Sequence, residues 1–137
     1  MLRYTTTGQN GPLSLHFVTI TTIAVLTIAV GCPLLLLGRD LLSLALYGSV
    51  LGAGMGLFLT ANWAQANRLA PAAEAGKYLG FTNLATAGAG ALARLEGPFI
   101  DALNNAQPGA WLGYTALFLF GALCALASLP LLRKIDG

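Results

Sequence analysis

Four long apolar stretches constrain this chain more than any other feature of its sequence. They cover residues 14–37, 41–61, 79–100 and 110–132, and a helix needs roughly 20 mainly apolar residues to cross a bilayer. Backbone groups in lipid must be paired within the protein, so such stretches form helices, and the alternating pattern of a membrane barrel is absent. The sequence therefore predicts an all-α integral membrane protein, a single membrane domain over residues 1–137 with four transmembrane helices.

The composition agrees with a lipid environment and disfavours several functional classes. Of the 137 residues, 56% are hydrophobic and only 9% are charged, whereas soluble domains carry about 25% charged residues. The net charge of +2 is too small and too scattered to predict nucleic-acid binding. Phosphate-binding loops, metal-ligand clusters and nucleophile–base pairs are missing, so we expect no enzyme activity, cofactor or metal. Cys32 and Cys124 lie in apolar runs and are expected to pack as small side chains.

The segments between the stretches contain the residues that end helices. Gly38, Arg39 and Asp40 predict a tight turn between the first two helices. Residues 65–78 are predicted to form a cytoplasmic loop, with Pro71 placed to begin a short surface helix. Pro108 lies in the segment that separates the last two helices.

Basic residues predict the orientation of the chain, because cytoplasmic segments are enriched in Lys and Arg. With both termini inside, the cytoplasmic side would hold Arg3, Arg68, Lys77, Arg133 and Lys134, against Arg39 and at most Arg94 outside. We therefore expect a multi-pass protein of the cell membrane with both termini in the cytoplasm.

The four helices differ in the kind of side chain that they carry. The first and fourth are rich in Leu, Ile, Val and Phe, which suit lipid, whereas the second and third are rich in Gly and Ala. Gly48, Gly52 and Gly56 recur every four residues, a spacing that lets helices approach closely. The sequence therefore predicts that these glycines form a helix-packing face and that the first and fourth helices face lipid.

The third stretch contains the charges that are hardest to explain in lipid. Arg94 and Glu96 precede Gly97-Pro98, and a charge within a membrane usually faces protein or water. Arg94 either reaches the interface with its long side chain or faces a hydrated cavity. Tyr47, near the middle of its helix, is a further candidate for lining a cavity.

Residues 52–101 carry an ordered set of motifs that resembles the C-terminal half of transporters of the major facilitator superfamily. The match runs through Gly52-x-Gly54-x-Gly56, Asn62-Trp63-Ala64-Gln65-Ala66, Leu69-Ala70-Pro71, Glu74-Ala75-Gly76-Lys77-Tyr78-Leu79-Gly80, Asn83 and Gly97-Pro98-x-x-Asp101. In that family a Gly-rich helix ends at the cytoplasm, and a Pro-containing loop and a second Gly-rich helix follow. With its flanking helices, the resemblance covers nearly the whole chain.

The resemblance implies the last four of twelve helices of a secondary transporter that moves a small solute by alternating access. Tyr47, Asn83 and Arg94 would then face the substrate cavity, and Glu96 would be a gate or proton partner. Four helices cannot enclose such a site, so the partners would be the rest of a longer transporter or another helical chain. Two alternatives remain open: a small four-helix homodimeric multidrug transporter, although residues 14–37 lack the expected acidic residue, and a non-transporting scaffold subunit.

Overall fold

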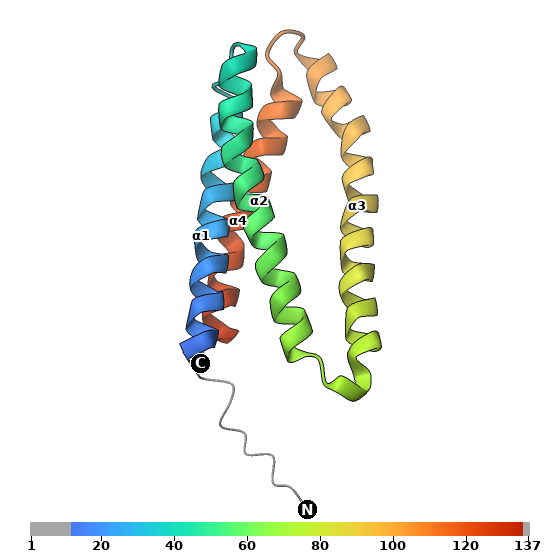
Figure 1. Ribbon diagram of the computed structural model, residues 1–137. Coiled ribbons are helices and arrows are strands. Elements are labelled where there is room, and N and C mark those ends of the chain that lie inside the picture. Colours follow the sequence, from blue (N-terminus) through green and yellow to red (C-terminus); the bar gives the residue numbers. More distant parts are fainter. Residues whose placement is uncertain (1–11, 136–137) are drawn as a thin grey trace, which may run out of the picture.

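The computed structural model describes residues 12–135, with the side chains of residues 16–68, 70–71 and 73–132. Its elements are α1 (Pro12–Leu35), α2 (Leu41–Leu69), the short 3₁₀ helix η1 (Ala72–Glu74), α3 (Ala75–Ala106) and α4 (Leu112–Ile135) (Figure 1). The described residues contain no strand, which confirms the predicted all-α fold class.

Three of the four predicted spans are confirmed as helices long and apolar enough to cross a membrane. They are His16–Leu35 in α1, Leu41–Arg68 in α2 and Leu112–Leu132 in α4. The remaining helix, α3, has 32 residues and is long enough, but Arg94, Glu96 and Asp101 make it more polar than the others. That α3 also crosses the membrane therefore stays a prediction.

The turn between α1 and α2 is closed by reciprocal hydrogen bonds at the start of α2. The backbone N–H of Ser43 donates to Asp40 Oδ1 at 2.9 Å, and Ser43 Oγ accepts from the backbone N–H of Asp40 at 3.2 Å. These bonds satisfy donors that the first turn of a helix otherwise leaves free. The backbone N–H of Ser43, together with its hydroxyl, which donates to Asp40 Oδ2 at 3.0 Å, lowers the pKa of the Asp40 carboxyl below its usual value of 3.8, because both bonds favour the ionised form.

The connection between α2 and α3 is shorter than the loop predicted over residues 65–78. Helix α2 continues to Leu69 and α3 begins at Ala75, with η1 directly after Pro71 as expected. The prediction was wrong because the polar residues after Ala61 end the apolar span without ending the helix. The third helix also continues past its predicted end at residue 100, through Pro98 to Ala106, although a helical proline lacks the N–H that would bond to the carbonyl four residues earlier.

Helix α1 packs against both α2 and α4, whereas α2 and α4 do not contact each other in the described chain. Thr21, Ala24, Val25, Ala29 and Cys32 on α1 account for most of the buried side chains of the described chain. The other face of α1 is open, with Ile23 and Val30 52% and 56% exposed, so the expectation that the first helix faces lipid stays a prediction for that face. Its apolar composition suits lipid and a protein interior equally well, and small residues on one face let the neighbouring helices approach.

Two glycines fix the crossing of α1 and α2. A Cβ added to Gly31 would lie 2.9 Å from the Cα of Leu51, and one added to Gly54 would lie 3.0 Å from the backbone nitrogen of Ile28. Where α1 meets α4, Gly121 of α4 lies against Cys32, and a Cβ added there would contact the sulfur at 3.6 Å. Close contact with α1 thus depends on Gly31 and Gly54 rather than on the predicted stripe.

The predicted packing glycines have no neighbour in the described chain. A Cβ added to Gly48, Gly52 or Gly56 would find nothing within 4 Å. This face of α2 is therefore uncovered, and its role in helix packing stays a prediction about another chain or another part of the protein.

Helix α3 stands apart from the other three along most of its length (Figure 1). It contains no buried residue. Near its C-terminal end it meets α4, where Asn104 Oδ1 accepts a hydrogen bond from the backbone N–H of Gly113 at 2.8 Å and Gly113 lies against Ile100. The two helices form a hairpin that opens away from this contact.

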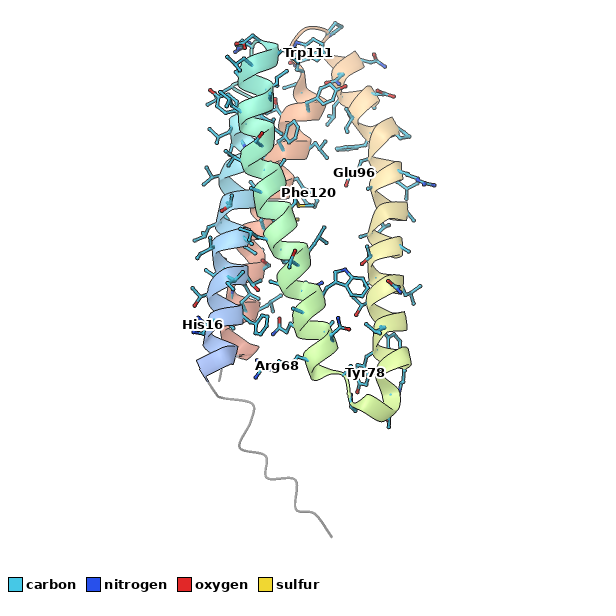
Figure 2. All side chains as sticks on the ribbon, viewed as in Figure 1. His16, Arg68, Tyr78, Glu96, Trp111 and Phe120 are labelled. Atoms are coloured by element: carbon cyan, nitrogen blue, oxygen red, sulfur yellow. The ribbon has the colours of Figure 1, made fainter. Side chains whose placement is uncertain are left out.

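The connections divide the basic residues between the two ends of the molecule. The start of α1, the end of α4 and the α2–α3 connection lie at one end (Figure 1). Arg68 and Tyr78 are found there, whereas Trp111 lies at the opposite end (Figure 2). This arrangement places the described ends of the chain on the same side as the α2–α3 connection. Arg3 lies outside the described residues, and which side is cytoplasmic stays a prediction.

Candidate functional site

The candidate residues on α3 point to two different faces of that helix. Asn83 and Arg94 are eleven residues apart, about three turns, and Asp101 follows Arg94 by about two turns, so the three share one face. Glu96 lies about 200° around the helix from Arg94. All four side chains are exposed. The predicted set of cavity residues is therefore divided, with Glu96 on the side of α4 and Asn83 and Arg94 on the far side.

Tyr47 lies on α2 and is half-buried. The structure does not place it together with the α3 candidates in one site of the described chain. Its role as a cavity residue stays a prediction.

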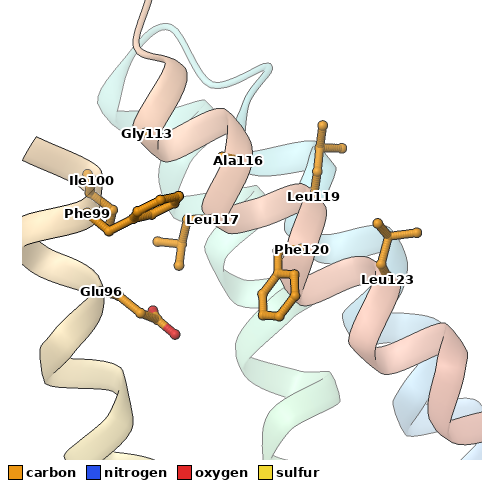
Figure 3. Close-up of a pocket in the computed structure, with 9 residues that line it drawn as sticks. All are labelled: Glu96, Phe99, Ile100, Gly113, Ala116, Leu117, Leu119, Phe120 and Leu123. Atoms are coloured by element: carbon orange, nitrogen blue, oxygen red, sulfur yellow. The ribbon is translucent and has the colours of Figure 1, made fainter. Parts of the chain in front are cut away.

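A groove of about 540 Å³ lies between the C-terminal part of α3 and the N-terminal part of α4. It is lined by Glu96, Phe99 and Ile100 from α3 and by Gly113, Ala116, Leu117, Leu119, Phe120 and Leu123 from α4 (Figure 3). The groove exists because α3 and α4 touch at Gly113 and then diverge. Its volume falls within the range of about 300–1,000 Å³ that is usual for small-molecule sites.

Glu96 is the one charged side chain among the nine described residues that line this groove. Its carboxylate points into the space between α3 and α4 (Figure 3). Within the described part of the chain, the one ion pair joins Lys77 Nζ to Glu74 Oε2 at 3.5 Å, far from the groove. Glu96 therefore faces an apolar space without a basic partner among the residues that the structure describes.

Sequence reasoning found Glu96 but missed the residues that surround it. Phe99 and Phe120 approach the groove from opposite helices (Figure 3). Phe99 follows Glu96 by three residues and shares its face, which was a readable signal. Phe120 is brought there only by the α3–α4 contact at Gly113, a tertiary feature.

The end of the molecule that holds the α2–α3 connection has its own contacts. The guanidinium carbon of Arg68 on α2 lies 5.7 Å from the ring centroid of Phe17 on α1, a cation–π contact. At the opposite end, the rings of Trp111 and Tyr114 lie 6.0 Å apart. In the part of the chain that the structure describes, no group of three or more His, Cys, Asp or Glu residues is placed to hold a metal ion.

Comparison with known proteins finds no matching family model, no curated relative and no similar solved structure.

Proposed function

We propose that this chain is the C-terminal four-helix part of a secondary active transporter that resembles the major facilitator superfamily. The observation that carries the proposal is α3, a 32-residue helix with no buried residue. Arg94 and Asn83 occupy the face that turns away from α4. Placing an arginine in the middle of a membrane costs roughly 2.5–3.5 kcal/mol or more, so this face requires other protein or water beside it.

In a transporter that works by alternating access, the face of α3 with Asn83 and Arg94 would line the path of the solute. In such a transporter, further helices would lie against α3 and the open glycine face of α2, and a hydrated path for a small solute would run between them. Arg94 would bind an anionic group or pair with a carboxylate from another helix. The ordered motifs from Gly52 to Asp101 support this assignment.

A genomic tag tests whether the chain belongs to a larger transporter. A C-terminal epitope tag is added to the native gene, and the protein is solubilised mildly and run on a native gel. The tagged species is expected to have the size of about twelve helices, in one chain or in a complex. A tagged homodimer of 14.1 kDa chains would favour the multidrug alternative, and a lone chain bound to unrelated membrane proteins would favour the scaffold alternative. Either result would contradict the proposal.

Uptake measurements on the tagged full-length protein test the role of Arg94. At matched membrane expression, Arg94→Ala is expected to abolish uptake of the transported solute. Arg94→Lys is expected to impair it, because lysine keeps the charge but loses the planar fork that binds carboxylates through two hydrogen bonds. Near-normal uptake with both variants would show that Arg94 only anchors α3 at the interface.

The orientation is part of the proposal and is tested by labelling. In a background without Cys32 and Cys124, an impermeant thiol reagent added outside cells is expected to label a cysteine at Asn105 and to spare one at Ala73. Asn105 lies at the C-terminal end of α3, and Ala73 lies in η1, just before α3 begins. The reverse pattern would place the termini outside.

A further inference from the structure

The groove between α3 and α4 combines three features that the hairpin itself does not need. Its walls are almost entirely apolar, it has a phenylalanine on each side, and it holds a single carboxylate. The contact at Gly113 and Asn104 already closes the hairpin without any contribution from Glu96. Glu96 and the two phenylalanines therefore remain available to a ligand.

The charge of Glu96 limits what that ligand can be. A carboxylate in a membrane is stabilised by a neighbouring cation or by water. None of the nine residues lining the groove is basic, and Arg94, the nearest arginine in the sequence, points to the opposite face of α3. The residues that line the groove therefore leave this counter-charge to the occupant of the groove.

We propose that this groove binds a lipophilic organic cation. Its apolar body would lie against Leu117 and Leu123, and its charge would lie near the Glu96 carboxylate. The faces of Phe99 and Phe120 would add cation–π attraction. A partner helix fits less well, because the α4 residues that line the groove, Gly113 to Leu123, span only about 15 Å, half of the roughly 30 Å that a helix crossing the bilayer would occupy.

This inference deepens the proposed function by naming a class of solute, and as a statement about transport it rests on that function. Binding does not rest on it. An equilibrium binding measurement can therefore fail while the native-gel and uptake experiments succeed, and the reverse can also occur.

Binding of radiolabelled tetraphenylphosphonium tests the proposal directly. Membranes that contain the tagged full-length protein are expected to bind this cation saturably. Tetraphenylborate, which has nearly the same shape and the opposite charge, is expected to bind without saturation. Glu96→Gln should weaken binding of the cation by about tenfold or more, since it removes the Coulomb attraction and keeps the side-chain shape.

Two further variants separate charge from shape. Asp101→Asn removes the same charge from another face of α3 and is expected to leave binding unchanged. Leu117→Trp, which fills the groove, is expected to weaken binding although Glu96 is intact. Equal binding of the two ions, or unchanged cation binding in both Glu96→Gln and Leu117→Trp, would overturn the proposal in favour of an acyl chain in the groove. Cation binding that appears only after a helical partner chain is stripped away would overturn it in favour of a partner helix.

Discussion

Helices α1 and α3 are both long, yet α1 supplies most of the buried side chains of the described chain and α3 contains no buried residue. Val25 on α1 is 2% exposed, whereas Leu92 and Leu95 on α3 are 67% and 70% exposed. The more apolar helix is the buried one, although apolar side chains gain little by leaving lipid. Apolarity alone therefore does not explain the difference.

The position of small residues explains it better than their number. Glycine is abundant on α3, but Gly80, Gly88, Gly90 and Gly97 contact no neighbouring element. On α1, the single Gly31 meets the backbone of α2. Close approach of two backbones increases the dispersion contacts of all the surrounding side chains, so one glycine at a crossing contributes more than several on an open face.

The largest expected effect comes from Gly31→Leu. The added side chain would meet the Leu51 backbone at 2.9 Å, and overpacking of a tight contact commonly costs about 1–3 kcal/mol. We expect a clear loss of thermal stability in detergent, measured by fluorescence-detected size exclusion after heating. Gly88→Leu, at an open position of α3, is the matched control and should leave the thermal stability unchanged. Equal destabilisation by Gly31→Leu and Gly88→Leu would show that the Gly31 crossing contributes no more to stability than an open glycine position.

The second prediction concerns the point where α3 is attached. Gly113→Val would force a branched side chain against the carbonyl of Ile100 and should separate the α3–α4 hairpin while leaving the contact of α1 with α2 intact. Distances between spin labels on α3 and α4, measured by pulsed electron resonance, should lengthen and broaden. Gly97→Ala, at an open position of α3, should leave them unchanged. An unaltered distance in Gly113→Val would mean that other contacts hold α3.

A smaller effect is expected from the hydrogen bond at the same place. Asn104→Ala removes the acceptor of the Gly113 N–H, and such bonds contribute about 0.5–1.5 kcal/mol. The same spin-label distances should broaden modestly, and Asn104→Asp, which keeps an oxygen acceptor, should restore them. If Asn104→Asp behaved like Asn104→Ala, the side-chain acceptor would not be the cause.

The smallest effect concerns the turn that precedes α2 and depends on pH. The pKa of Asp40 is lowered in the folded chain, so its ionised carboxylate stabilises the start of α2 above pH 3.8, and this contribution is lost as the pH falls below that value. Circular dichroism during thermal unfolding should show a slightly steeper acid loss for the parent than for Asp40→Asn, which keeps a cap but does not titrate. Identical loss of thermal stability in acid for the parent and Asp40→Asn would show that the Asp40 charge does not stabilise the start of α2.

The sequence by itself determined the number and nature of the helices. Local signals are sufficient for this, because a backbone in lipid has to pair its own N–H and C=O groups. The turn at Gly38–Asp40, the short helix after Pro71 and the break near Pro108 were all readable in the same way. The break also contains Gly109 and Trp111 with φ of 87° and 53°, and the positive angle of Trp111, unusual for a side chain of that size, was not readable.

Only the tertiary structure decided which helix supplies most of the buried side chains and where the groove lies. Composition could not rank α1 above α3, because lipid and protein interior are similar solvents for Leu, Val and Ala. The decisive contacts are Gly31 with Leu51 and Gly113 with Ile100, and each joins residues from different helices. Such pairs depend on where two helices cross, which no periodicity within either helix specifies. For the same reason the sequence identified Glu96, and only the fold placed Phe120 across from it.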